Sequence, residues 1–165
     1  MYCPSTAVSI FREPEVVRFI TKTREKSREE AVVDVFNETP GGSGFCSRGV
    51  QDGGSTVGYE LVDLQSRTTV PFAWLSDKLP PNWNEELRHG KFSFSREGFA
   101  FAGDIIEGAI REGAKVLLLD EIGKLELKGS GFAPLLRQAL DSGSDLVIGC
   151  RKVNIEPIKS EFGIS

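Results

Sequence analysis

The sequence has 165 residues, of which 39% are hydrophobic and 27% are charged, and its formal net charge is −4. This composition is typical of a soluble globular protein with a buried core and excludes a disordered chain. The acidic balance argues against a nucleic-acid-binding protein, which usually carries a basic excess. Every apolar run is far shorter than the ~20 residues that cross a bilayer, and the first residues lack the pattern of a secretory signal. We therefore expect a protein without a membrane segment, and the scattered cysteines favour the cytoplasm.

Few side chains are available for zinc binding or for a serine hydrolase. Cys3, Cys46 and Cys150 are widely spaced, and His89 is the single histidine of the chain. A structural zinc site takes about four nitrogen or sulfur ligands, and the Gly-x-Ser-x-Gly motif of a common hydrolase class is missing. We expect neither kind of site, and we expect the thiols to be reduced.

In chain order, the first expected element is a helix over Pro14–Ala31, because proline suits a first helical turn. The role of the preceding segment Tyr2–Phe11 is open: it could form the first sheet strand through "AVSIF", or it could cross to a neighbouring molecule. The glycine-rich stretch Thr39–Gly44 is expected to be a flexible break. Asp-Gly within Gln51–Gly54, between two β-rich runs, predicts a β-hairpin.

The second half of the sequence alternates helices and strands after an irregular loop over Ser76–Lys91. One amphipathic helix is expected between Ser95, its N-cap, and Gly113, and a second over Phe132–Ser142. This alternation favours a parallel sheet covered by helices, with strands buried on both faces. The expected strands are Val116–Leu119 and Asp145–Cys150.

Two acids, Asp120 and Glu121, directly follow the apolar strand Val116–Leu119. Ligands of open α/β sheets bind at the carboxyl ends of strands, and Mg²⁺ prefers oxygen ligands from carboxylates and phosphates. The pattern is typical of a Walker B element, in which Asp120 would hold Mg²⁺ and Glu121 would activate the attacking water. A strand that merely ends in surface acids has equal weight on this motif alone. Lys124 is a candidate phosphate contact, although a solvated charge is the simpler interpretation.

The segment "VLLLDEIGKLEL", together with "GFCSRGV" and "GGSTVGYELVDL" before it, resembles the THEP-type nucleoside-triphosphatase family. The resemblance extends over about Gly44–Arg151, and it includes "RHGKFSFSREGF" and "DLVIGCR" in the family's order. It implies a P-loop NTPase-like α/β fold of the RecA/ASCE type, with a mostly parallel sheet flanked by helices and an added hairpin. We expect one domain over 1–165, with a divergent segment 1–43, a family-like core 44–151 and a tail 152–165.

The resemblance also implies Mg²⁺-dependent hydrolysis of nucleoside triphosphates such as ATP or GTP. Asp120 would then lie on the Mg²⁺ side, and Glu121 would be the catalytic base. Arg151 matches the place of a phosphate-sensing residue, although a surface arginine is the simpler interpretation of it.

The phosphate-binding loop of that family is missing from its expected place. Such a loop reads G-x-x-x-x-G-K-[ST], and its backbone N–H groups surround the phosphates. Chain order places it near Ala7–Thr23, which holds no glycine, and Glu13 and Glu15 there would repel a polyphosphate. We interpret the glycine-rich Gly41–Cys46 as a linker. In Lys128–Leu136 we expect Ser130 to cap a helix, with an anion contact as the less favoured alternative.

Two functions remain open at this stage. In the first, slightly favoured for this chain, a degenerate family member acts without turnover as a regulatory or protein-binding module, alone or as a homo-oligomer. In the second, the chain binds and cleaves nucleoside triphosphates through a non-standard loop, and Mg²⁺ is its cofactor only when nucleotide is bound. A P-loop encoded upstream of Met1 would be a third explanation. Neither a membrane nor nucleic acid is expected as a partner.

Overall fold

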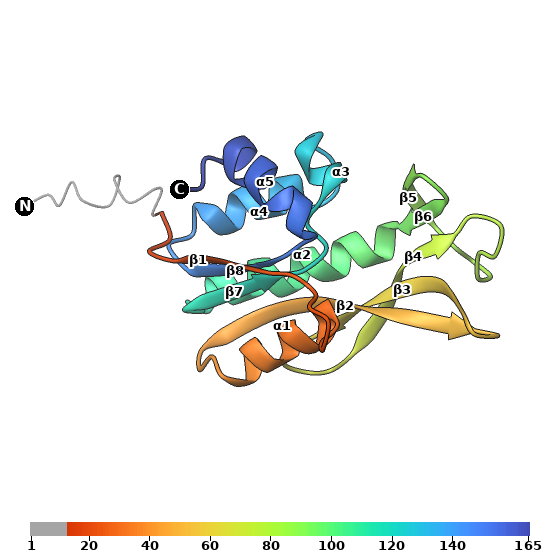
Figure 1. Ribbon diagram of the computed structural model, residues 1–165, viewed down its shortest axis with the longest axis horizontal. Helices are drawn as coiled ribbons and strands as arrows, with labels where there is room; N and C mark the ends of the chain where they lie inside the picture. Colours follow the sequence, from red (N-terminus) through yellow and green to blue (C-terminus); the bar gives the residue numbers. More distant parts are fainter. Residues whose placement is uncertain (1–12) are drawn as a thin grey trace, which may run out of the picture.

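The computed structural model describes residues 13–165, so the segment Tyr2–Phe11 lies outside the described residues. Eight strands form one sheet in the order β1-β8-β7-β2-β3-β4-β6-β5 (Figure 1). The first four strands in this order are parallel: β1 (Val17–Ile20), β8 (Asp145–Gly149), β7 (Val116–Leu119) and β2 (Gly42–Asp52). The rest continue antiparallel: β3 (Ser55–Asp63), β4 (Thr69–Leu75), β6 (Phe92–Ser95) and β5 (Glu85–His89).

Helices cover both faces of this sheet, as Figure 1 shows. Three of them pack on one face, and α1 packs on the other. This arrangement confirms the α/β fold class expected from the sequence. The helices are α1 (Arg28–Asn37), α2 (Arg96–Arg111), the short α3 (Lys124–Leu127), α4 (Ala133–Leu140) and α5 (Ile155–Phe162), with a 3-10 turn at Lys152–Asn154. Within residues 13–165, no helix combines the length and the apolar character that crossing a membrane requires.

The position of β7 in the sheet explains why its sequence has no polar alternation. Leu117 and Leu119 pack into the core under α2 and α4, whereas Leu118 packs into the core under α1. All three side chains are essentially inaccessible to solvent. A strand with helices on both faces has two buried sides, so each of its positions is apolar.

Several sequence expectations are confirmed. Ser95 caps α2 by accepting a hydrogen bond from the N–H of Gly98 at 2.9 Å. The predicted hairpin joins β2 and β3, and Gly53 and Gly54 both have positive φ, at 58° and 82°. A two-residue turn of this kind matches the twist of the flanking strands.

The helix predicted over Pro14–Ala31 is wrong. The structure has the strand β1, a loop over Thr21–Ser27, and then α1. Val17 and Phe19 pack on one face of the sheet and Ile20 on the other, which is a strand period rather than a helical one. Parallel pairing with β8 therefore determines the conformation of this charge-rich segment, although its composition also suits a helix.

Two further loop predictions are wrong. Gly42 and Gly44 belong to β2 and pair with β7, so Gly41–Cys46 is not a linker and Thr39–Gly44 is not a flexible break. A Cβ atom on Gly44 would lie 2.0 Å from the carbonyl oxygen of Leu118, so glycine is needed for close strand approach there. The loop expected over Ser76–Lys91 contains β5, which pairs with β6.

Candidate functional site

Three connecting segments meet at the carboxyl edge of the parallel strands. β1 leads into the loop Thr21–Ser27, β7 leads into Asp120 and Glu121, and β8 leads toward Arg151. The pairing of β8 with β1 on one side and β7 on the other aligns these strand ends. The fold thus places the acid pair beside the segment that precedes α1, as expected for a site in an open α/β sheet.

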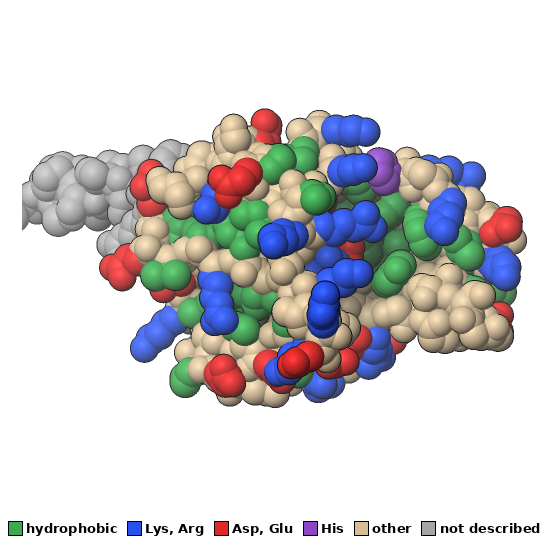
Figure 2. Space-filling view, in the orientation of Figure 1, with side chains coloured by type: hydrophobic (Ala, Val, Ile, Leu, Met, Phe, Trp, Pro, Cys, Tyr) green, Lys and Arg blue, Asp and Glu red, His purple; other side chains and the backbone are tan. Residues whose placement is uncertain are grey.

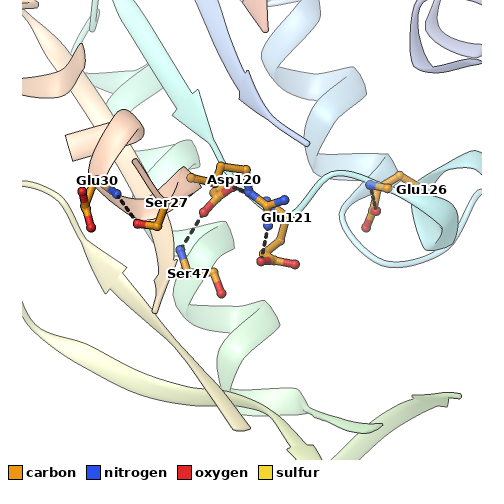
Figure 3. Close-up of polar contacts among 8 residues, drawn as sticks. Ser27, Glu30, Ser47, Asp120, Glu121 and Glu126 are labelled. Atoms are coloured by element: carbon orange, nitrogen blue, oxygen red, sulfur yellow. Dashed lines mark hydrogen bonds and ion pairs between the residues drawn. The ribbon is translucent and has the colours of Figure 1, made fainter. Parts of the chain in front are cut away.

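Asp120 is 1% exposed, and both of its carboxylate oxygens accept hydrogen bonds. Its Oδ1 atom accepts from Nε of Arg28 at 2.7 Å and from the N–H of Glu121 at 2.8 Å. Its Oδ2 atom accepts from the N–H of Ser47 at 2.9 Å (Figure 3). A Cβ atom on Gly149 would lie 2.2 Å from Oδ1, so this carboxylate occupies space that only glycine leaves free. A charged group buried this deeply is stable because every strong acceptor is paired.

Glu121 has a positive φ of 64°, which is a strained backbone conformation for a glutamate. Its Oε1 atom accepts a hydrogen bond from Nη2 of Arg28 at 2.5 Å. Burial and the neighbouring charge of Asp120 raise the pKa of Glu121, and the charge of Arg28 partly offsets this rise. Although burial alone would lower it, the pKa of Arg28 is raised, because the charges of Asp120 and Glu121 outweigh that effect.

Ser47 belongs to β2 and lies beside the acid pair, next to Asp120 and Glu121 in Figure 3. Its residue is 7% exposed, and its hydroxyl oxygen has no hydrogen-bond partner. The hydroxyl lies close enough to Glu121 to favour that residue's charged form, outside hydrogen-bonding geometry. A buried hydroxyl without a partner is uncommon in a native structure and marks a position where a ligand or water could bind.

The loop Thr21–Ser27 stands where a phosphate-binding loop would connect β1 to α1, so the earlier placement near Ala7–Thr23 is wrong. Three of its N–H groups are used inside the loop. Thr23 donates to the carbonyl of Lys26 at 2.9 Å, and Glu25 and Lys26 donate to the Thr23 hydroxyl at 3.3 and 3.1 Å. A phosphate cradle needs N–H groups that point at the ligand, and these do not.

Arg28 is the functional residue that the sequence analysis missed. It is the first residue of α1, and Ser27 caps that helix by accepting a hydrogen bond from the N–H of Glu30 at 3.1 Å. The Ser-x-x-Glu spacing of Ser27 and Glu30 was the available signal for this helix start. It would have placed Arg28 in the first turn, facing the carboxyl edge of the sheet.

Lys124 and Arg151 are exposed, as the first residue of α3 and the residue before the 3-10 turn. Within residues 13–165, neither forms a hydrogen bond or ion pair with Asp120 or Glu121. Figure 2 shows that lysine and arginine side chains gather near the middle of one face of the molecule. Phosphate contacts of Lys124 and Arg151 therefore remain predictions.

Glu126 accepts hydrogen bonds from two N–H groups, those of Gly123 at 2.6 Å and Phe132 at 2.8 Å. Burial raises the pKa of this carboxyl to about 7, although the two N–H donors oppose the rise. Phe132 is the N-cap of α4, so the prediction that Ser130 caps this helix is wrong. The group that accepts from the N–H of Phe132 at this helix N-terminus is the protein's own Glu126 carboxyl.

The acid pair as arranged does not fit a Mg²⁺ ion. Mg²⁺ requires near-octahedral oxygen coordination and is usually held by one or two carboxylates together with phosphates. Here Arg28 contacts both carboxylates, and backbone N–H groups donate to both oxygens of Asp120. In the described part of the chain, no group of three or more His, Cys, Asp or Glu side chains could hold a metal ion.

Comparisons with known proteins agree with this architecture. A family model described as "NTPase" matches residues 29–162. Nucleoside-triphosphatase THEP1 of Thermotoga petrophila is 28% identical over 130 residues, which cover 73% of this chain and 65% of that protein. The cancer-related nucleoside-triphosphatase of Homo sapiens is 30% identical over 110 residues, which cover 64% of this chain and 57% of that protein. The chain thus spans less than two-thirds of the length of both relatives.

A solved structure supports the same conclusion for the fold. The solution structure of a human cancer-related nucleoside triphosphatase superposes with a TM-score of 0.56 and 23% sequence identity. The match covers 90% of this chain and 84% of that one. The family match covers most of the sequence, and this chain belongs to the family of THEP1-type nucleoside-triphosphatases.

Proposed function

We propose that this chain is a non-hydrolysing member of the nucleoside-triphosphatase family, which acts as a regulatory or protein-binding module. The observation that carries this proposal is the position of Arg28. Its guanidinium bridges Asp120 and Glu121, the two acids that would otherwise hold Mg²⁺ and activate water. An arginine is permanently charged and cannot supply the open coordination positions of a metal ion.

The loop Thr21–Ser27 supports the same proposal. It contains no glycine, and three of its backbone N–H groups bond to Thr23 and Lys26 within the loop. A triphosphate approaching this edge would find neither a cradle of N–H groups nor a metal ion to neutralise its charge. The internal contacts of this loop and of Arg28 thus support the absence of phosphoryl transfer.

Hydrolysis is the second candidate function, and Glu121 is the observation that favours it. This residue keeps a strained left-handed backbone beside a buried aspartate, and strain of this kind often marks functional positions. In that case Asp120 would be the Walker B aspartate on the Mg²⁺ side and Glu121 the catalytic base. ATP or GTP would be the substrate, and Arg28 would have to leave the acids.

The cytoplasm is the proposed location. The free thiols of Cys46 and Cys150 are buried, and burial raises their pKa values to about 12 and about 11. Thiols of this kind are structural rather than reactive and suit a reducing compartment.

A combined binding and turnover experiment tests the proposal. Thermal unfolding is followed with Mg²⁺ and millimolar ATP, GTP or ADP, and phosphate release is measured in the same samples. We expect no nucleotide-dependent stabilisation and no release. A working site saturated at about 100 times its dissociation constant would add about 2.7 kcal/mol to the unfolding free energy. Phosphate release that Glu121→Gln abolishes would establish the second candidate instead. Nucleotide-dependent stabilisation that Asp120→Ala abolishes would show a working nucleotide site and contradict the proposal.

A further inference from the structure

We infer that Arg28 is a tethered counter-ion that masks a divalent-cation site formed by Asp120, Glu121 and Ser47. The wild-type protein is then indifferent to Mg²⁺ and Mn²⁺, and removal of the Arg28 charge exposes a metal site. This inference concerns the metal ion alone, so it goes beyond the proposed absence of nucleotide hydrolysis.

The Arg28 side chain donates hydrogen bonds to both acids. Nε of Arg28 donates to Asp120 at 2.7 Å, and Nη2 donates to Glu121 at 2.5 Å. The planar guanidinium fork can reach two carboxylates at once, which a lysine ammonium does poorly. Loss of this one side chain therefore frees an oxygen on each acid at the same time.

The hydroxyl oxygen of Ser47 provides a third possible ligand beside the acids. The hydroxyl of Ser47 is buried, has no hydrogen-bond partner, and lies close to Glu121. Serine and threonine hydroxyls are suitable ligands for hard cations, as are carboxylates. Two carboxylates and one hydroxyl, completed by water, make a reasonable half-shell for Mg²⁺ or Mn²⁺.

The Asp120 carboxylate would keep its position without Arg28. Asp120 retains the N–H donors of Ser47 and Glu121, which do not depend on the arginine. Gly149 continues to leave room for the carboxylate. The guanidinium excludes a metal ion in the wild type because a divalent cation placed among the same oxygens would lie next to a fixed positive charge.

The experiment is a Mn²⁺ titration followed by electron paramagnetic resonance, without nucleotide, on the wild type and on Arg28→Gln. We expect Arg28→Gln to bind Mn²⁺ about tenfold more tightly than the wild type or better, because one like charge at short range has been removed. Thermal unfolding with millimolar Mg²⁺ should stabilise Arg28→Gln and leave the wild type unchanged. The double variant Arg28→Gln with Asp120→Asn should lose both effects.

Lys26→Gln is the matched control. Lys26 lies two residues earlier and pairs with Asp34 at the surface, so the substitution removes an equal charge without touching the acid pair. Its Mn²⁺ affinity should equal that of the wild type.

Two outcomes would overturn the inference. One is Asp120-dependent Mn²⁺ binding by the wild type, and the other is a folded Arg28→Gln that gains no affinity. If Arg28→Gln does not fold, Arg28→Met replaces it, because methionine also removes the charge and keeps an apolar stem of similar length. Arg28→Met should also gain Mn²⁺ affinity, and no gain would count against the inference. Failure here is distinct from failure of the proposed function, which would be seen as nucleotide turnover by the wild type.

Discussion

The guanidinium of Arg28 lies 2.7 Å from Oδ1 of Asp120, a residue 92 positions later in the chain. This contact joins the start of α1 to the end of β7, and Asp120 is 1% exposed. The ion pair therefore connects the segment that would bind phosphate to the segment that would bind metal. A single positive charge thus contacts both acids at this edge of the sheet.

A double-mutant cycle on Arg28 and Asp120 should show strong coupling. Asp120→Ala leaves a partly buried arginine without its main partner, and Arg28→Ala leaves a buried carboxylate. We expect each change to lower the unfolding free energy by about 3 kcal/mol, as typical for breaking a buried pair. The double variant should cost clearly less than the sum, because neither charge is left alone. Urea denaturation measures all four proteins, and additive losses would show that the pair is not coupled.

Gly149→Ala should displace the Asp120 carboxylate and so disrupt the acid pair. The new Cβ atom would meet Oδ1 of Asp120 at 2.2 Å and displace the carboxylate from its donors. We expect a loss of about 3 kcal/mol in unfolding free energy. Gly103→Ala in α2 is the control, since its Cβ atom would have no neighbour closer than 3.8 Å. That change should raise stability by about 0.5–1 kcal/mol, because alanine favours the helix. Equal effects of the two substitutions would contradict the placement of Asp120.

Gly44→Ala tests the close approach of β2 and β7. Its Cβ atom would lie 2.0 Å from the carbonyl oxygen of Leu118, and this backbone atom cannot move without breaking the strand pairing. We expect a loss of at least about 3 kcal/mol, or no folded protein. Gly49→Ala in the same strand has its nearest neighbour at 3.5 Å and should change stability by less than about 1 kcal/mol. Circular dichroism melts compare the two, and a stable Gly44→Ala would mean that the strands do not pair there.

Glu126 should make stability fall as the pH rises toward neutrality. Burial raises the pKa of this carboxyl from 4.5 to about 7 in the folded state. The folded protein therefore binds more protons than the unfolded chain between these values. The stabilisation is fully present below pH 4.5 and is lost as the pH rises through about 7, by up to about 3 kcal/mol.

Urea denaturation of wild type and Glu126→Gln from about pH 5 to pH 8 measures this effect. Glutamine does not titrate, so the stability of the variant relative to the wild type should improve as the pH rises. Parallel pH profiles would assign the pH dependence to other groups.

The sequence by itself determined the elements with strong local signals. The apolar run Val116–Leu119 could only be a strand buried on both faces, and Ser95 marked the start of α2. The alternation of helices and strands, together with the acids after β7, was sufficient for the α/β class and for the family resemblance. These features depend on the residues of one segment and its period, so no distant contact was needed to interpret them.

Only the tertiary structure decided the other features, because they depend on contacts between distant segments. β1 is a strand because it pairs with β8, about 130 residues later, although its own sequence also suited a helix. Gly44 is a strand residue because the backbone of Leu118 leaves no room for a Cβ atom. Arg28 faces Asp120 and Glu121 because β1 and β7 flank β8 and end at the same edge of the sheet. A local pattern cannot predict which side chain will contact a buried carboxylate from a distant segment. Here that side chain is Arg28, which contacts both acids.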